Sequence, residues 1–246
     1  YTYLKGHALS LRVRKEKIYP DLDRGVNPRK GYYFGLRYVR EWNQFLDDFT
    51  TEGGDINEVF TSYNYNRISA DLETYFPVPY TRHHSLTVRL QGGYIDDADI
   101  NDFFYFFAGG FIGMKGFSYY SIGGTNMSIG TVTYRFPLAR NLNLQLWNWH
   151  LEKIYLGTFY QYGNAWSQSG FNLGDFKSDV GIQLRLESFS WYMFPTRIFF
   201  EAAYPLESTD FIDLESDVVV NYSQDWRFYF GILFDFVENG KTWFSK

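Results

Sequence analysis

Residues 102–138 read DFFYFFAGGFIGMKGFSYYSIGGTNMSIGTVTYRFPL and decide which kind of fold the chain adopts. An aromatic run leads into the pair Gly109-Gly110, and the tetrapeptide Met114-Lys115-Gly116-Phe117 follows. A second pair, Gly123-Gly124, precedes a segment in which polar and apolar residues alternate as far as Pro137. This order predicts a long irregular loop that leads into a β-strand.

The same two-residue alternation recurs along the whole chain. Runs of about ten residues place apolar side chains on one face and polar or charged side chains on the other, as strands of a β-sheet do. In 66–76, for example, Ile68 and Leu72 alternate with Ser69 and Asp71. About ten residues is also the length that a tilted strand needs to cross a bilayer. Nine strands are predicted, at 4–14, 32–41, 66–76, 84–94, 125–136, 153–163, 179–189, 196–204 and 226–236.

Composition favours a membrane barrel, although alternation alone also fits a soluble sandwich. Aromatic residues make up 22% of the 246 residues, and a barrel places many such rings at the two membrane interfaces. An apolar run of about 18 residues is absent, which excludes a transmembrane helix but not a barrel with a polar lumen. A net charge of −5 without a basic stripe argues against nucleic-acid binding. The chain has no cysteine, which excludes disulfides and thiolate metal sites.

The connections between these strands differ in length. Long loops are predicted at 42–65, 95–124, 164–178 and 206–225, whereas 77–83 and 190–195 are short and 15–30 and 138–152 are longer. Long loops outside and shorter turns in the periplasm are usual for outer-membrane barrels. Nine is an odd number, and an open sheet leaves two unpaired edges in lipid. We therefore expect further strands on the N-terminal side, or a second chain, to complete the barrel.

The landmarks around Met114–Phe117 resemble the loop-six signature of BamA-like assembly factors, members of the outer-membrane protein 85 (bacterial surface antigen) superfamily. In that family a Val/Ile-Arg-Gly-Phe/Tyr tip folds back inside the barrel. The similar stretches are Phe107–Gly110, Ile122–Gly124 and Tyr134–Leu138, and 27–31 (NPRKG) is similar to a Pro-x-x-Gly turn of the family. The resemblance implies an all-β, antiparallel transmembrane β-barrel over residues 1–236 with loop 95–124 folded inward, and a tail at 237–246. The chain would form the C-terminal part of a sixteen-strand barrel.

The family's tip arginine pairs with acidic residues on the inner wall of the next two strands. Here the tip residue is Lys115, and the corresponding wall positions are Thr133 and Gln161. Because the cation and both anions have changed together, we expect neutral acceptors, another lumen carboxylate such as Asp71 or Glu73, or water to hold Lys115. The wall residues expected to face the tip are Thr133, Arg135, Gln161, Asp71 and Glu73.

Residues 229–236, YFGILFDF, resemble the β-signal of outer-membrane proteins. Its pattern is a polar residue, a glycine two positions later, and aromatic residues three and five positions after the glycine. The matching residues are Tyr229, Gly231, Phe234 and Phe236. In that class the assembly machinery recognises the last strand by strand pairing. Gly231 would also weaken pairing locally, which favours a seam that opens.

The resemblance implies an outer-membrane protein of a Gram-negative-type bacterium that inserts or translocates polypeptides through a lateral seam. Its expected partners are outer-membrane lipid and either unfolded outer-membrane client proteins or a complex partner; no nucleic acid, cofactor or metal is expected. The alternative is a structural or partner-docking barrel that has lost insertase activity, which the changed Lys115, Thr133 and Gln161 favour. A barrel lipase or protease is a third hypothesis.

Motifs for catalysis or metal binding are weak. The four histidines form no HExxH pattern, and neither GxSxG nor a phosphate-binding glycine loop is present, so we expect no catalytic residue. Residues 96–102 form an acidic cluster that is expected to be a solvated outer loop. Calcium binding there is the alternative, although the spacing lacks the glycine and the distal glutamate of an EF-hand.

Overall fold

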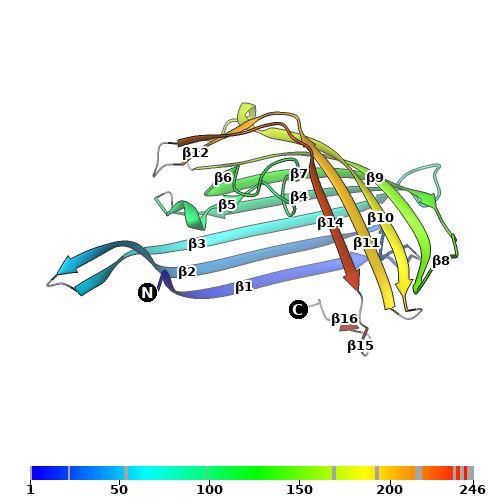
Figure 1. The fold of residues 1–246 in the computed structure, drawn as a ribbon, viewed down its shortest axis with the longest axis horizontal. Helices are drawn as coiled ribbons and strands as arrows, with labels where there is room; N and C mark the ends of the chain where they lie inside the picture. The colour runs from blue at the N-terminus through cyan, green and yellow to red at the C-terminus, as the bar shows by residue number, and fades with distance from the viewer. Residues whose placement is uncertain are drawn as a thin grey trace.

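The computed structural model describes residues 2–21, 23–52, 55–97, 99–167, 170–191, 194–213, 218–234, 237–238 and 241–242. One curved antiparallel sheet dominates it (Figure 1). Nine strands follow one another across this sheet in chain order, and the short β8 (Leu144–Leu146) pairs with β9. The nine are β1 (Leu4–Ile18), β2 (Gly31–Glu52), β3 (Asp55–Pro77), β4 (Ser85–Ile95), β7 (Asn126–Ala139), β9 (Trp149–Trp166), β10 (Lys177–Ser190), β11 (Phe194–Pro205) and β14 (Arg227–Phe234).

Three small hairpins and two short helices complete the described structure. The hairpins join β5 (Phe106–Phe107) to β6 (Gly123–Gly124), β12 (Thr209–Asp213) to β13 (Val218–Tyr222), and β15 (Val237–Glu238) to β16 (Lys241–Thr242). The helices are 3₁₀ turns, η1 (Asp102–Phe104) and η2 (Leu173–Asp175). In the described part of the chain, no helix has the length and apolar character to cross a membrane.

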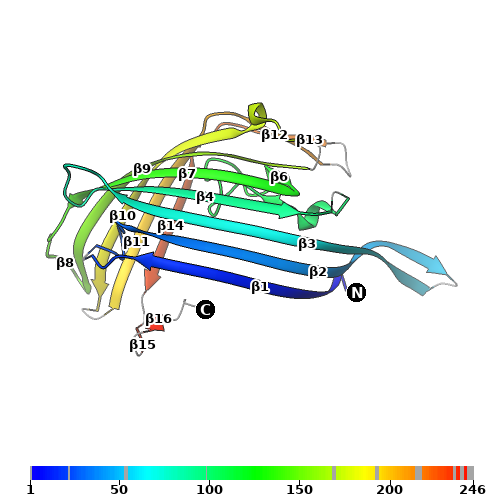
Figure 2. The same ribbon diagram turned by 180° about the vertical axis from the view of Figure 1, so that it is seen from behind.

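The sheet bends into a trough whose two margins are β1 and β14. Figure 2 shows β1 to β4 as one wall, with β10, β11 and β14 crossing behind it at a steep angle. Among the described residues, β1 pairs only with β2 and β14 only with β11, so these strands do not close a barrel. The all-β antiparallel prediction and the nine principal strands are confirmed.

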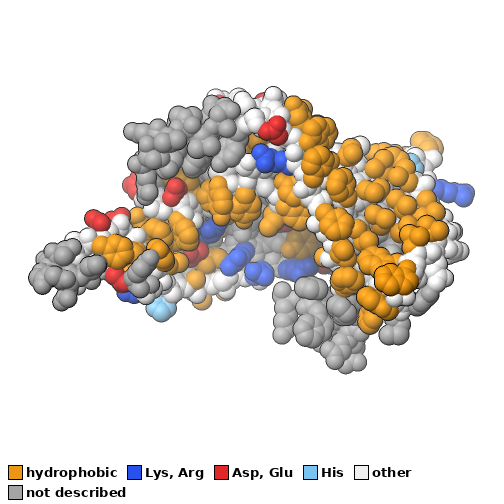
Figure 3. Space-filling view, viewed as in Figure 1, with side chains coloured by type: hydrophobic (Ala, Val, Ile, Leu, Met, Phe, Trp, Pro, Cys, Tyr) orange, Lys and Arg blue, Asp and Glu red, His pale blue; other side chains and the backbone are white. Residues whose placement is uncertain are grey.

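The alternation predicted from the sequence sets the two faces of this trough. Outward side chains are apolar and exposed, among them Leu72 at 38%, Leu90 at 52% and Ile182 at 47%. Figure 3 shows apolar side chains covering the outer surface over β10, β11 and β14. Inward positions carry polar and charged groups, such as Arg89, which donates to Asp71 within the hollow.

Segment 42–65 is not the loop that its polar composition predicted. Strands β2 and β3 continue through it to the pair Glu52↔Asp55, with one register shift between Leu46 and Asp48. The resulting hairpin projects beyond the rest of the sheet (Figure 1). Aromatic and β-branched residues in this segment, such as Tyr63 and Tyr65, suit an extended strand and pack against the loop that follows β4.

Candidate functional site

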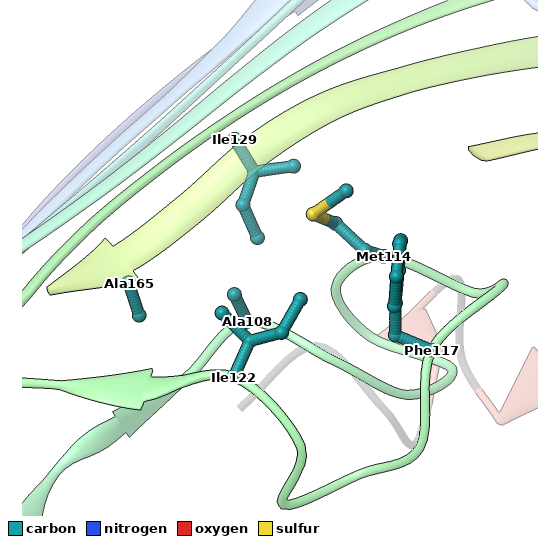
Figure 4. Close-up of a cluster of buried hydrophobic side chains, with 6 residues drawn as sticks. All are labelled: Ala108, Met114, Phe117, Ile122, Ile129 and Ala165. Atoms are coloured by element: carbon teal, nitrogen blue, oxygen red, sulfur yellow. The ribbon is translucent and has the colours of Figure 1, made fainter. Parts of the chain in front are cut away.

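Loop 95–124 lies against the inner wall of the trough and is seated on it by two apolar clusters. In the first cluster, the wall contributes Ile129 of β7 and Ala165 of β9, and the loop contributes Ala108, Met114, Phe117 and Ile122 (Figure 4). Met114 is fully buried and Phe117 is 3% exposed. Burying these side chains against the wall supplies the hydrophobic free energy that holds the loop inside.

The second cluster fixes the beginning of the loop to the projecting hairpin. Phe104 of η1 packs on Tyr65 and Phe45, with ring centroids 5.6 and 5.8 Å away. Ile95, Tyr65 and Phe104 are all at most 5% exposed. The extended part of β2 and β3 therefore gives the first part of the loop its support.

Glycines let the tip turn sharply and approach the wall closely. Gly110 has φ of 93°, a conformation that side chains rarely adopt, and its N–H donates to the carbonyl oxygens of Met114 and Phe117, both at 3.0 Å. A Cβ on Gly116 would lie 2.6 Å from the Cβ of Asp179 and 2.9 Å from the backbone nitrogen of Pro205. Only glycine fits this second position without displacing β10 and β11.

The backbone of the tip is hydrogen-bonded to three wall strands. Gln161 of β9 accepts from the Lys115 N–H and donates to the Gly113 carbonyl, each at 2.9 Å. Asp179 of β10 accepts from the Gly116 N–H at 2.8 Å. On β14, the Tyr229 hydroxyl donates to the Lys115 carbonyl at 2.8 Å, and Arg227 Nε donates to the Gly116 carbonyl at 2.9 Å. The tip therefore bridges the middle of the sheet and its last strand.

The Lys115 ammonium forms an ion pair with Glu201 of β11. The Lys115 side chain is 19% exposed and that of Glu201 is 3% exposed. The ammonium also lies over the ring of Phe159, 4.9 Å from its centroid. A lumen carboxylate thus holds Lys115, from the strand that passes beside the tip.

The expectation that Asp71 or Glu73 would be this carboxylate is wrong. Asp71 accepts from Arg89 Nε at 3.0 Å, and Glu73 lies beside Tyr75. Both belong to β3, whereas the tip lies against β9 to β14. Glu201 could have been found in the sequence, since it occupies the inward phase of the predicted strand 196–204.

The other predicted wall residues divide between tip contacts and wall contacts. Gln161 bonds to the tip directly, whereas buried Thr133 makes no hydrogen bond to it among the described residues. The neighbouring Thr131 accepts from Gln161 Nε2 at 2.9 Å instead. Arg135 donates to Gln183 at 2.9 Å and to Thr87 at 3.3 Å, so it ties β7 to β10 and β4.

On β14, Tyr229 contacts the tip, and Gly231 lies beside the Phe199 ring of β11. A side chain at Gly231 would collide with the ring of Phe199, which stacks on Phe111 of the loop at 5.6 Å. Phe111 also packs on Tyr229, with centroids 5.3 Å apart. Phe234 pairs with Thr196 at the end of β14, and Phe236 lies outside the described residues. Gly231 thus makes room for an aromatic contact between β11 and the loop.

A family model for the Omp85 superfamily domain matches residues 3–236. The chain belongs to the Omp85 superfamily. This confirms the resemblance drawn from the loop and the last strand, and members of the superfamily are outer-membrane proteins of Gram-negative-type bacteria. A comparison with curated proteins found no match.

A second segment of this Omp85 chain, the β1–β2 turn, also packs into the trough. Asp23 is fully buried and lies 3.2 Å from Arg140, 3.2 Å from Lys153 and 3.4 Å from His83. Burial by itself would raise the pKa of Asp23, but the neighbouring Tyr155, Lys153 and Arg140 outweigh it and hold the pKa below its ordinary value.

Asn27 anchors the other side of the same turn. Asn27 Nδ2 donates to the His83 carbonyl at 2.9 Å, and its Oδ1 accepts from the Ser85 hydroxyl at 2.5 Å. The sequence offered only the weak Pro-x-x-Gly similarity here, because polar residues in a turn are normally solvated. Their partners come from strands far along the chain, which no local pattern reveals.

In the acidic segment 96–102 of the Omp85 chain, carboxylates accept hydrogen bonds from backbone N–H groups. Asp96 accepts from the Asn66 N–H at 2.7 Å, and Asp97 accepts from the Asp99 N–H at 3.1 Å. Asn101 accepts from the Phe103 N–H at 2.9 Å and begins η1. Within the ranges that the structure describes, no three acidic or histidine side chains converge as metal ligands.

Proposed function

We propose that this chain is part of an outer-membrane barrel that inserts or translocates polypeptides, and that β14 is one lip of a lateral seam at which an incoming strand pairs. The observation that carries the proposal is the double hydrogen bond from the loop tip to β14, through Tyr229 and Arg227. A lumen loop bound to the edge strand can hold that edge in place while its outer side stays open to a client.

The geometry of β14 supports this role. It pairs with β11 along eight residue pairs, whereas β10 and β11 form twelve. An unpaired edge offers a row of N–H and C=O groups to which an extended peptide can add. Phe228 and Phe230 are 64% and 67% exposed on its outer face, as expected of side chains that would contact lipid.

The proposal also requires a closed wall in the membrane. Two free edges in lipid would each leave unsatisfied backbone groups, at a cost of several kcal/mol per group. We therefore propose that further strands, to a total of sixteen, join β1 to the seam. The same requirement would be met by a second chain, which is the alternative on this point.

The rival function is a structural or partner-docking barrel. The replacement of the family's tip arginine by Lys115 favours it, because lysine cannot form the bidentate pair. The ion pair to Glu201 favours insertion instead, since the tip is still held by a charge from the wall. Because one observation favours docking and the other favours insertion, an experiment must distinguish the two functions.

Photo-crosslinking in the native outer membrane separates the two functions. In the test variant, a photoreactive residue would replace Phe230 on the edge strand β14. In the control it would replace Leu90, which also points outward but belongs to β4, a strand paired on both sides. Insertion predicts a set of different unfolded outer-membrane proteins bound at position 230 and none at position 90. One fixed partner at position 230 would support docking, and no adduct at all would contradict both functions.

A further inference from the structure

The connection between β1 and β2 enters the trough instead of turning at its rim. Adjacent antiparallel strands are usually joined by about 2–5 residues, whereas this connection spans 19–30. Within it, Asp23 and Asn27 are fully buried and Val26 is 1% exposed. Residues 23–30, here called the inner turn, are therefore anchored inside the trough.

Contacts of the inner turn extend across the trough from β1 and β2 to strands near the other margin. Asn27 is bonded to the start of β4. Asp23 lies 3.2 Å from Lys153 of β9, and the Val26 carbonyl accepts from Arg185 of β10 at 3.5 Å. Figure 2 shows this connection, in dark blue, beside the ends of β10 and β11. The inner turn thus crosses one end of the trough.

Loop 95–124 enters the trough from the opposite end and approaches the inner turn. Gly25 and Val26 line a cavity of about 340 Å³ together with Phe111 of the loop. At Gly25 the inner turn also comes so close to β11 that a Cβ would lie 2.5 Å from Arg197 Nη2. An inserted segment therefore occupies the trough at each end.

We propose that the inner turn closes its end of the barrel lumen, so that neither ions nor a polypeptide pass along the lumen while it is bound. The charges favour the bound position, because withdrawal of Asp23 would remove a buried anion from beside Lys153 and Arg140. The closure follows from the contacts of the inner turn and does not rest on the insertion function.

Thiol labelling tests whether the inner turn stays inside the trough. The chain has no cysteine, so one introduced thiol gives a signal without background. Val26→Cys places this thiol at a position that is 1% exposed, and Arg24→Cys is the matched control at an exposed position of the same turn. In the full-length protein in detergent micelles, we expect a polar maleimide to label Val26→Cys at least about tenfold more slowly than Arg24→Cys. Equal rates would overturn the inference.

A reversal of charge at Asp23 should release the inner turn. Asp23→Lys would place a cation against Arg140 and Lys153, which repel it. Asp21→Lys is the matched control, because it makes the same change of charge in the same connection. The partner of Asp21 is Arg29, which belongs to the connection itself, so this variant should keep the inner turn bound.

Single-channel conductance of the full-length protein in planar lipid bilayers measures the closure. We expect the parent and Asp21→Lys to give no steady open-pore current. Asp23→Lys should raise the conductance at least about threefold and should also speed the labelling of Val26→Cys. Faster labelling without a rise in conductance would show that the inner turn does not close the lumen. A steady open-pore current from the parent would overturn the inference even if Asp23→Lys does not fold.

Discussion

At the scale of the residue, Gln161 and Glu201 divide a task that the family pattern gives to acidic wall residues. A carboxylate only accepts hydrogen bonds, whereas the Gln161 amide accepts from Lys115 and donates to Gly113. Glu201 then supplies the charge that Lys115 needs. The change from acid to amide at position 161 is therefore compatible with a fixed tip.

Removing the charge of Glu201 should loosen the tip. Glu201→Gln leaves a largely buried ammonium without its carboxylate, and we expect a loss of about 3 kcal/mol in the free energy of unfolding. The double variant with Lys115→Met and Glu201→Gln should recover most of the lost free energy of unfolding. Urea unfolding of the four species in a double-mutant cycle measures the coupling. Asp71→Asn is the control, because the Asp71–Arg89 pair is about one-third exposed and should cost about 1 kcal/mol or less. A coupling near zero would contradict the ion pair.

Gly116 should tolerate no side chain. Gly116→Ala places a methyl group against Asp179 and Pro205, which we expect to destabilise the protein by about 1–3 kcal/mol. Gly92→Ala is the matched control, since the nearest atom to its Cβ is 3.9 Å away. Unfolding midpoints of the two variants test the contact, and equal midpoints would refute it.

Asp23 should make stability fall in acid. Its folded pKa lies below the unfolded value of about 3.9, so its contribution is complete above that value and is lost as pH falls through the folded pKa. Asp23→Asn should therefore be less stable than the parent at pH 7, by about 3 kcal/mol, and the gap should close below about pH 4. Urea midpoints of both proteins between pH 7 and pH 3 give the comparison. A gap that does not vary with pH would show that Asp23 is not a paired charge.

Residues of the site were predictable where a local pattern marks them. The glycines of the tip and inward Gln161 follow from motif and phase. Glu201 shares the inward phase, but its pairing with Lys115 could not be predicted, nor could the burial of Asp23. Each of these residues meets partners from distant strands, and no single segment shows how the sheet curves. Of the alternatives expected for Lys115, the structure shows a lumen carboxylate, but it is Glu201 and not Asp71 or Glu73.

At the scale of the element, strands were easier to predict than loops. Two-residue alternation persists through each strand because one face meets apolar surroundings and the other polar ones. Segment 42–65 was predicted as a loop because Asn, Asp and Glu are common in loops. In the structure its two halves pair with each other as the outer parts of β2 and β3. The helix η1 and the aromatic run after β4 cover that hairpin, which explains why aromatic residues persist there.

Phe104 should hold the first part of the loop against β2 and β3. Phe104→Ala removes a ring that is 5% exposed and contacts Tyr65, and we expect faster amide hydrogen exchange across 100–106 with unchanged protection of β9 and β10. Phe103→Ala, which removes a ring that is 59% exposed, should have a smaller effect. Hydrogen-exchange mass spectrometry resolves the two segments. Equal exchange in both variants would mean that the cluster does not fix the loop.

At the scale of the whole molecule, the outer face of the trough should behave as a lipid surface. Leu90 is 52% exposed, and on a water-facing surface its replacement by arginine would change stability by about 0.5 kcal/mol or less. In a bilayer, Leu90→Arg should cost about 2–4 kcal/mol. Unfolding measurements in lipid vesicles distinguish a water-facing Leu90 from a lipid-facing one. Gln44→Arg, on the projecting hairpin, is a nearly neutral control. A neutral Leu90→Arg would contradict a membrane barrel.

The loop also limits how far the two margins of the trough can separate. It is fastened near one margin, where Phe104 and Phe106 join the hairpin of β2 and β3, and at the other margin, where Lys115 and Gly116 bond to β14. The chain between Phe106 and Lys115 can stretch to about 30 Å. This segment therefore has a fixed maximum length. If β14 moves outward farther than that length allows, the tip must first separate from the wall.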